Sequence, residues 1–182
     1  MALHAPRLTT SAELVQYIDN NADSDSMCAA AVTAFVGDVN GFGGQYRRTP
    51  LTIAVVRARR DTILTLSARG DVDANREDGG GWSPLGCAAY YNKGMVGVLL
   101  DAFPSIDVNH IDSSDGMTAL HWSAVNGSDV NVGLLLARGA DTMIEDNHGR
   151  TVEDTARVYG HRNVVDMLRQ VGPVHCATLS AL

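Results

Sequence analysis

Apolar residues along the chain recur at the spacing of short amphipathic helices. Val96, Leu99 and Phe103 lie three or four positions apart, and so do Val164 and Leu168. Such intervals place apolar side chains on one face of a helix and predict a helix with one buried side. The stretches that follow are rich in Asp, Asn and Gly, a composition typical of tight turns. The pattern therefore predicts an all-α chain of short helices joined by polar turns.

A motif that opens with Thr or Ser recurs along the chain at nearly constant spacing. It begins at Thr49, Ser83, Thr118 and Thr151, so successive copies are offset by 34, 35 and 33 residues. Pro follows in the first two copies. This pair is a typical helix start, because the hydroxyl caps the helix and Pro fits its first turn. The recurrence predicts a series of similar structural units.

Glycine marks a second fixed point in the repeat. Gly70, Gly139 and Gly172 each lie 21 residues after a motif start. They follow an apolar segment and predict a helix end in the left-handed conformation. Each unit is thus expected to hold two helices, neither of which buries its apolar face alone. Stacking of neighbouring units buries these faces, so the predicted architecture is a solenoid with hairpin-like finger loops.

The start of the chain holds a degenerate unit. Gly37 lies 33 residues before Gly70, but the segment lacks a Thr-Pro-Leu opening. We interpret it as an N-terminal cap with helices near 11–20 and 26–36. Its link Gly41-Phe-Gly-Gly44 is not followed by the Lys and Ser or Thr of a phosphate-binding loop, so turn geometry explains these glycines. A link so rich in glycine predicts a loosely docked cap.

These motifs resemble the ankyrin repeat family, whose period is 33 residues and whose units open with T-P-L-H-x-A. Thr118-Ala-Leu-His-Trp-Ser123 and Thr49-Pro-Leu-Thr-Ile-Ala54 are close matches. The resemblance covers residues 11–173 and implies an all-α ankyrin-repeat solenoid formed by a single domain. It implies tails at 1–10 and 174–182, and units near 11–44, 45–78, 79–112, 113–146 and 147–173.

The resemblance also implies structural roles for single positions. His121 occupies the motif His and is expected to make hydrogen bonds that tie neighbouring turns together. His161 occupies the position between the two helices of the last unit. Glu153 and Arg169 are charged where the family places a buried Leu. We expect this of a terminal unit, because its outer face meets water.

Composition narrows the classes of function. The chain of 182 residues has 14 Lys and Arg against 21 Asp and Glu, a formal charge of −7. Nucleic-acid binding depends on many Lys and Arg contacts to phosphates, so a negative chain argues against it. No apolar run approaches the roughly 20 residues that span a bilayer, and the first residues lack the pattern of a secretory signal. We expect a cytoplasmic protein, with the nucleus as the alternative, that contacts no nucleic acid or membrane.

The residue types that carry chemistry are scattered. Cys28, Cys87 and Cys176 form no CxxC pair, so we expect buried thiols rather than a zinc site or a disulfide framework. None of the six histidines has a partner at the i, i+4 spacing of a helical zinc site. No nucleophile and base are paired. We expect no catalytic residue, metal or cofactor, with an enzyme of unrecognised site as the remote alternative.

The expected finger segments are acidic. Their net charges are −2 over 69–78, −3 over 107–116 and −2 over 141–150. One interpretation is ordinary solvated charge, and the other is a dipolar face that orients a partner with a basic patch. The opposite charge gathers near the start of the second unit, at Arg47, Arg48, Arg57, Arg59 and Arg60.

In the ankyrin family the binding face comprises the finger tips and the inner helix of each unit. The resemblance implies that this chain binds another protein there, as an adaptor, scaffold or inhibitor, and is a monomer when free. The alternative is a regulatory subunit or assembly chaperone of a larger enzyme complex. Aromatic, Met and Arg side chains at such positions are typical of interface centres. Carried over position by position, the implied partner-binding residues are Tyr46, Arg48, Arg57, Trp82, Tyr90, Tyr91, Asp115, Met117, Asn126, His148, Arg150 and Tyr159.

Overall fold

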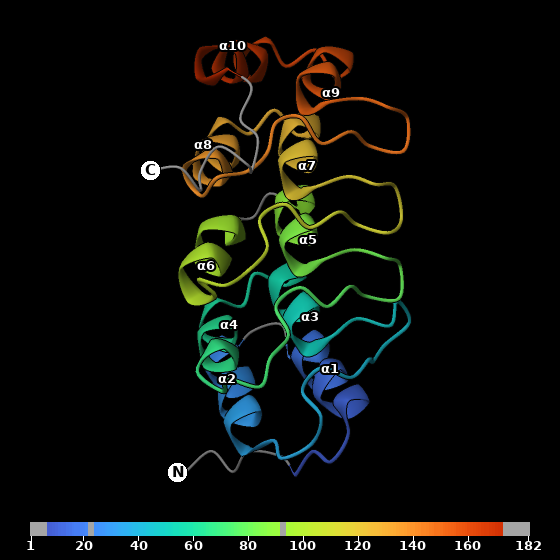
Figure 1. Ribbon diagram of the computed structural model, residues 1–182. Coiled ribbons are helices and arrows are strands. Elements are labelled where there is room, and N and C mark those ends of the chain that lie inside the picture. The colour runs from blue at the N-terminus through green and yellow to red at the C-terminus, as the bar shows by residue number, and fades with distance from the viewer. Residues whose placement is uncertain (1–6, 22–23, 92–93, 173–182) are drawn as a thin grey trace. The chain divides into compact units, whose positions relative to one another are not determined.

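A computed structural model describes residues 7–21, 24–91 and 94–172 of the chain. Over these residues the regular structure is helical, with one isolated β-bridge, and the expected all-α repeat fold is confirmed (Figure 1). The helices are α1 (Ser11–Asn20), α2 (Asp25–Ala34), α3 (Pro50–Val56), α4 (Arg60–Ser67), α5 (Pro84–Tyr91), α6 (Met95–Ala102), α7 (Ala119–Val125), α8 (Asp129–Ala137), α9 (Val152–Val158) and α10 (Arg162–Val171).

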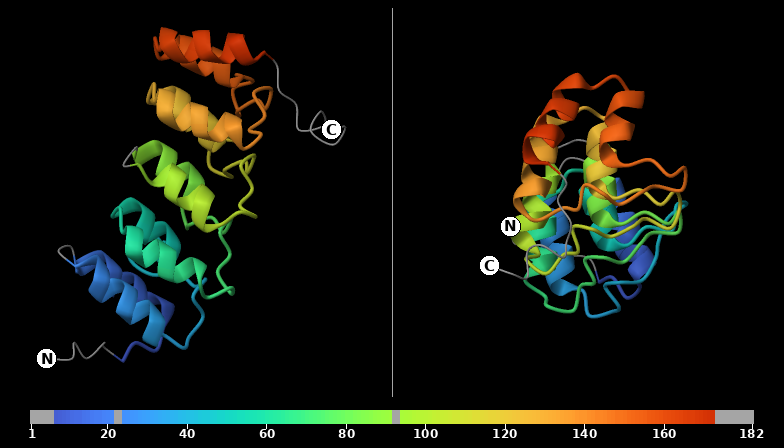
Figure 2. Two further views of the ribbon diagram at one scale, coloured as in Figure 1. Left: turned by 90° about the vertical axis from the view of Figure 1, so that its left-hand side faces the viewer. Right: turned by 45° about the horizontal axis from the view of Figure 1, so that its top comes forward.

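The chain divides into two compact units. Unit 1 comprises Met1–Pro84 with Val98–Ile106, and unit 2 comprises Leu85–Gly97 with Asp107–Leu182. In unit 1, α1 pairs with α2 and α3 with α4, while α1 packs on α3 and α2 on α4. Unit 2 repeats this arrangement, with α7 on α9 and α8 on α10 (Figure 2). Within each unit, therefore, helical pairs stack as a repeat fold requires. The single domain over 11–173 stays a prediction.

The helices of the repeat begin where the sequence predicts them. A hydroxyl oxygen of the preceding residue accepts a hydrogen bond from a backbone N–H in the first turn of α3, α7 and α9. This bond satisfies one of the donors that a helix start leaves without a partner. The capping residues are Thr49, Thr118 and Thr151.

The second helices also end as expected. Gly70 and Gly139 follow α4 and α8 with φ of +74° and +81°, and Gly172 ends α10 with φ of +72°. Left-handed backbone of this kind is favourable for glycine because it has no Cβ. Glycine at these positions therefore lets the chain leave each second helix toward the next finger loop.

The core of both units consists of aliphatic side chains from the facing helices. The largest fully buried ones include Leu14, Ile18, Leu51 and Leu66 in unit 1 and Leu85, Leu120 and Leu135 in unit 2. Cys28 and Cys87 are buried free thiols, as expected, and burial raises the pKa of the Cys28 thiol. Cys176 lies outside the described residues.

The N-terminal cap contradicts the loose docking that its glycines predicted. A Cβ atom on Gly43 would lie 2.7 Å from the Cα of Ala12 and from the Cβ of Val15, both in α1. A Cβ atom on Gly41 would collide with the side chain of Ser11. Glycine is therefore present here because the backbone approaches α1 closely. The link is rich in glycine for tight packing rather than for freedom of movement.

The last helical pair has the polar outer face that a terminal repeat requires. Glu153 in α9 accepts hydrogen bonds from Arg157 at 2.5 Å and from Arg169 in α10 at 2.8 Å. These charged side chains are partly exposed, and Glu153 pairs with Arg157 within α9 and with Arg169 across to α10. Among the described residues, no helix is long and apolar enough to cross a membrane.

Candidate partner-binding surface

The finger turn Asp78–Trp82 of unit 1 is a tight loop built around one carboxylate. The backbone N–H of Asp78 donates to the carbonyl of Trp82 at 2.9 Å. Asp78 Oδ1 accepts the N–H groups of Gly80 and Trp82 at 2.8 and 3.2 Å. Gly81 has φ of +79°, which closes the loop. The turn therefore presents Trp82 directly before Ser83, the residue that precedes α5.

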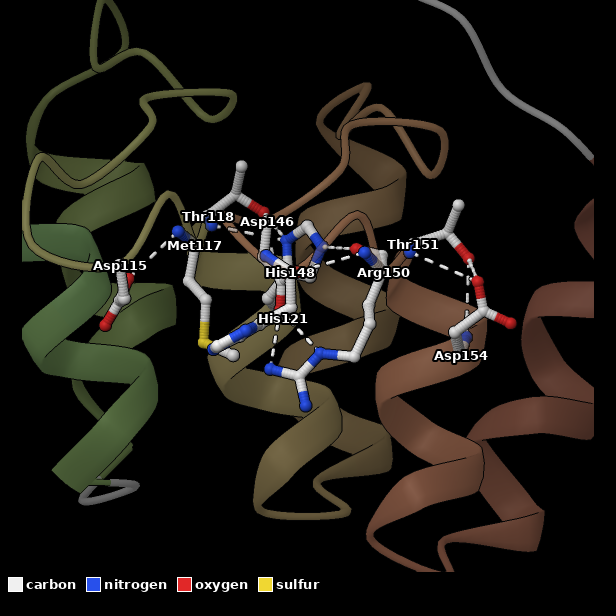
Figure 3. A network of polar contacts seen from close by, with 9 residues as sticks. All are labelled: Asp115, Met117, Thr118, His121, Asp146, His148, Arg150, Thr151 and Asp154. Atoms are coloured by element: carbon white, nitrogen blue, oxygen red, sulfur yellow. Dashed lines mark hydrogen bonds and ion pairs between the residues drawn. The ribbon is translucent and has the colours of Figure 1, made fainter.

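The finger turn Asp146–Arg150 of unit 2 has the same construction (Figure 3). Asp146 N–H donates to the carbonyl of Arg150 at 3.0 Å, and Asp146 Oδ1 accepts the N–H groups of His148 and Arg150. The Arg150 guanidinium folds back onto Asp146 Oδ2 at 2.7–2.8 Å. Burial alone would raise the pKa of the Asp146 carboxyl, but the hydrogen bonds from Arg150 and His148 outweigh it and lower the pKa.

His121 connects this turn to the start of α7. Its Nδ1 accepts the backbone N–H of Thr118 at 3.3 Å and lies 2.9 Å from the Thr118 hydroxyl. The ring proton therefore belongs on Nε2, which lies 3.2 Å from the carbonyl oxygen of Arg150 and donates to it. Burial lowers the pKa of His121 and keeps the ring neutral. His121 thus ties two successive repeats together, as the motif position implied (Figure 3).

Aromatic side chains gather on the inner helices of unit 2. We use inner helix for the first helix of each pair, and in unit 2 these are α5, α7 and α9. The Tyr90 ring contacts the rings of Tyr91 and Trp122 edge to face, each with centroids 5.1 Å apart. Tyr90 is 42% exposed, whereas Tyr91 and Trp122 are half-buried. We call Tyr90, Tyr91 and Trp122 the aromatic cluster.

Asn126 fixes the helices that carry the aromatic cluster. Its side-chain amide donates to the backbone carbonyls of Ala89 and Tyr90 at 2.9 and 2.8 Å. In the next repeat, His161 Nε2 lies 2.9 Å from the carbonyl oxygen of Val125. Both side chains therefore join the end of one inner helix to the following repeat. His161 has the structural position that the resemblance implied, and Asn126 shares this role.

The implied binding residues of unit 1 are held by neighbouring charges and rings. Arg57 is exposed and pairs with Asp19 at 2.6 Å. The Arg48 guanidinium carbon lies 4.9 Å from the centroid of the Tyr46 ring, and Arg48 Nε lies 4.0 Å from Asp78 Oδ2. Tyr46 is 62% exposed. The Tyr46 ring is therefore exposed on the finger, the Arg48 side chain is mostly buried beside it, and Arg57 is exposed at the end of α3.

Met117 corrects the expected surface. It is 5% exposed and therefore cannot join an exposed apolar centre. It lies directly before the cap Thr118, where its N–H donates to Asp115 Oδ1 at 2.9 Å. Its thioether is packed into the fold rather than offered to a partner. His148 and Tyr159, by contrast, are exposed as expected.

Sequence reasoning missed Trp122. It occupies the variable fourth position after Thr118, which is not among the positions carried over from the family. The available signal was the residue type itself, because the chain has few aromatic residues and large rings favour interfaces.

The finger loops of unit 2 are acidic. Over 107–117 and 139–150 they contain six carboxylates and a single arginine. That arginine, Arg150, is already paired with Asp146. The described residues of either unit taken alone bring together no three His, Cys, Asp or Glu side chains that could hold a metal ion. The loops of unit 2 thus form an acidic border beside inner helices that carry exposed aromatic rings.

Residues 98–177 match the family model for ankyrin repeats in three copies. The chain is 44% identical over 79 residues to zinc finger CCCH domain-containing protein 24 of Oryza sativa subsp. japonica, a match that covers 42% of this chain and 10% of that protein. It is 36% identical over 126 residues to zinc finger CCCH domain-containing protein 50 of the same organism, covering 54% and 19%. It is 31% identical over 104 residues to SMC5-SMC6 complex localization factor protein 1 of Bos taurus, covering 56% and 10%. The matches thus span less than a fifth of these relatives.

Proposed function

This chain is an ankyrin repeat protein, and we propose that it is a non-catalytic module that binds another protein through its finger loops and inner helices. Ankyrin repeats are generally protein-interaction modules, and the family is typically non-catalytic. The observation that carries the proposal is the aromatic cluster of unit 2. Tyr90 leaves much of its ring exposed, while Tyr91 and Trp122 hold it in place from two sides.

A rigid, partly exposed aromatic ring supports a role at the centre of an interface. Tyr and Trp are enriched among the residues that dominate binding energy, because they bury a large area with little loss of side-chain freedom. Asn126 bonds to the Tyr90 and Ala89 carbonyls, so the backbone under the cluster is fixed before a partner binds. Such preorganisation reduces the entropic cost of association.

The acidic finger loops of unit 2 support a partner with a basic patch. Opposite charges around an interface accelerate the encounter of two proteins and fix their orientation. We propose an adaptor, scaffold or inhibitor in the cytoplasm, or alternatively the nucleus, that is a monomer until the partner binds. A regulatory subunit or assembly chaperone is the alternative role. Constitutive copurification with one complex would favour that alternative, and exchange among partners would favour an adaptor.

Affinity purification of the chain as bait, followed by mass spectrometry, identifies the partner. The binding constant is then measured for the wild type and for Tyr90→Ala. Truncating a central aromatic residue costs about 2 kcal/mol or more of binding energy, which corresponds to roughly 30-fold in affinity. Trp82→Ala and Tyr91→Ala should weaken binding as well. Val130→Ala is the matched control, because Val130 is 70% exposed on α8, away from the inner helices.

Thermal melts of the same variants separate binding from folding. Tyr90→Ala loses two edge-to-face ring contacts and should cost about 1–2 kcal/mol of stability, whereas Leu85→Ala removes a fully buried side chain and should cost about 2–5 kcal/mol. Normal binding by a well-folded Tyr90→Ala variant would place the interface elsewhere. Association rates that do not change between low and high salt would remove the acidic loops from the mechanism.

A further inference from the structure

Unit 1 holds a second surface of different chemistry. The guanidinium carbons of Arg47 and Arg76 lie 5.1 and 4.8 Å from the centroid of the Phe42 ring. Because both lie close to one centroid, the two cationic groups are at most about 10 Å apart. Both arginines are exposed, and Phe42 is half-buried in the same finger as Arg47. We call Phe42, Arg47 and Arg76 the arginine clamp.

The backbone holds the two arginines of the clamp beside each other. Gly43 and Arg48 form an antiparallel bridge with two hydrogen bonds of 2.9 Å, which closes the first finger. Gly79 N–H of the second finger donates to the Arg47 carbonyl at 2.9 Å. A Cβ atom on Gly79 would collide with the Arg47 side chain, so glycine permits this close approach. The two fingers are therefore joined at Arg47 itself.

Arg47 has a strained backbone. Its φ is +48°, a left-handed conformation that costs a non-glycine residue about 1–2 kcal/mol. The neighbouring Gly44 and Gly79 show that glycine is used freely in these fingers. Glycine would adopt this conformation with less strain. The presence of an arginine therefore indicates that its side chain has a role other than stabilising the fold.

The clamp arginines have no carboxylate partner in the described part of the chain, unlike Arg57 and Arg69 of unit 1. Arg57 pairs with Asp19, and Arg69 pairs with Asp71 at 2.8 Å. Arg47 and Arg76 contact the Phe42 ring but form no ion pair with a described residue. Both side chains are exposed, and a ring face satisfies their charge in part but accepts no conventional hydrogen bond.

We infer that the arginine clamp binds a single phosphoryl group carried by a side chain of a protein. Two guanidinium groups present a charge of +2 and paired donors. A phosphoryl group carries about −1.5 to −2 at neutral pH and has three acceptor oxygens, enough to accept hydrogen bonds from two guanidinium groups. A carboxylate has one negative charge and two oxygens, which suit hydrogen bonds to a single guanidinium group. The ligand is therefore of a different class from the basic partner proposed for unit 2, and the inference does not depend on that surface.

The surroundings of the clamp favour an isolated phosphoryl group over a nucleic-acid backbone. Asp73, Glu77 and Asp78 lie in the same finger as Arg76. A chain of phosphates would pass these carboxylates and be repelled, whereas one phosphoryl group contacts the two guanidinium groups alone. The glycine-rich link Gly41–Gly44 does not bind the ligand through its amides in this proposal. It positions Phe42, and the arginine side chains supply the donors.

The test compares phenyl phosphate with benzoate, which has the same ring but a carboxylate. Side-chain Nε–H signals of the intact chain are followed by NMR during each titration. Phenyl phosphate is expected to shift the signals of Arg47 and Arg76 and to bind about tenfold more weakly to Arg47→Gln or Arg76→Gln, since each variant loses one charged hydrogen-bonding group. Arg60→Gln is the control, because Arg60 is exposed in α4 of the same unit and the substitution removes the same charge.

A second titration identifies the macromolecule that carries the group. Peptide pools with a fixed central phosphoserine or phosphotyrosine should bind through Arg47 and Arg76, and the same pools without phosphate should not. Four outcomes overturn the proposal. These are equal binding of benzoate, equal loss in Arg60→Gln, tighter binding of oligothymidylate than of the phosphopeptides, and the absence of any shift at the two arginines. All of the variants alter exposed side chains, so circular dichroism should show an unchanged fold.

Discussion

The finger turns Asp78–Trp82 and Asp146–Arg150 have the same backbone and different surface chemistry. In both, an Asp accepts two backbone N–H groups and a left-handed Gly stands at the fourth position. In the unit 2 turn, the last residue is Arg150, which neutralises the carboxylate of its own turn. In the unit 1 turn that position is Trp82, and Asp78 Oδ2 lies 4.0 Å from Nε of Arg48 in the preceding finger.

This comparison shows how one repeat supports different surfaces. The Asp and the Gly determine the path of the chain, so the last residue of the turn is free to vary. Where the last residue is an arginine, as at Arg150, its positive charge pairs with the Asp of the same turn. Where it is Trp82, the turn has no arginine of its own, and Arg47 and Arg76 of the same unit contact Phe42. The surface chemistry of a finger can thus differ between repeats while its backbone stays the same.

The largest expected effect tests whether the cores of unit 1 and unit 2 are equally well packed. Leu51 and Leu120 lie two residues after the motif threonine of their repeats, and both are 1% exposed. Leu51→Ala and Leu120→Ala should each lower the free energy of unfolding by about 3 kcal/mol, because each leaves a cavity. Urea unfolding measures both values. A loss below about 1 kcal/mol in one variant alone would show that its unit is packed differently.

The second test removes the carboxylate that both turns share. Asp146→Ala should cost about 3 kcal/mol, because it leaves two backbone N–H groups and Arg150 without their acceptor in a buried setting. Asp78→Ala should cost about half as much, since its arginine contact is long. Urea unfolding again gives both values. Asp146→Asn keeps one acceptor oxygen and should fall between wild type and Asp146→Ala.

The turns and helix ends were predictable because local chemistry decides them. Thr118 caps α7 and Gly139 ends the following helix wherever the chain happens to pack, since their effects act within one turn. The link at Gly43 shows where such reasoning fails. Its glycine was interpreted as a sign of backbone flexibility. The structure shows instead that Gly43 packs closely against α1, and this contact depends on the tertiary structure. A single sequence does not show which residue lies within 3 Å of a glycine.

The candidate surface was predictable to the level of the repeat position and not beyond it. The spacing from the motif correctly indicated that Tyr46, Tyr90 and Tyr159 are exposed. It did not indicate that Met117 is buried, although Met117 directly precedes the motif threonine just as Arg48 precedes Thr49. The arginine clamp joins residues 34 positions apart in two fingers, and no local pattern brings Phe42 and Arg76 together.

A third test uses the pH dependence of stability. Thr52 in unit 1 stands where His121 stands in unit 2, three residues after the motif threonine. Burial lowers the pKa of His121 below its usual 6.5. Below pH 6.5 the unfolded chain therefore takes up a proton that the folded chain does not, and stability falls as the pH falls. His121→Thr copies unit 1 and should reduce this decline between pH 7.5 and 5, measured by urea unfolding at each pH with buffer ionic strength held constant.

The smallest expected losses of stability come from replacing one arginine by glutamine in each unit. Arg150→Gln removes a guanidinium that bonds to a buried carboxylate and should cost about 1.5 kcal/mol. Arg76→Gln removes an exposed cation from the face of Phe42 and should cost about 0.5 kcal/mol. Urea unfolding at low and high salt separates the two, because exposed charges are screened more strongly than buried ones. If Arg76→Gln proved as costly as Arg150→Gln, Arg76 would be needed for folding, and its position on Phe42 would no longer indicate a binding role.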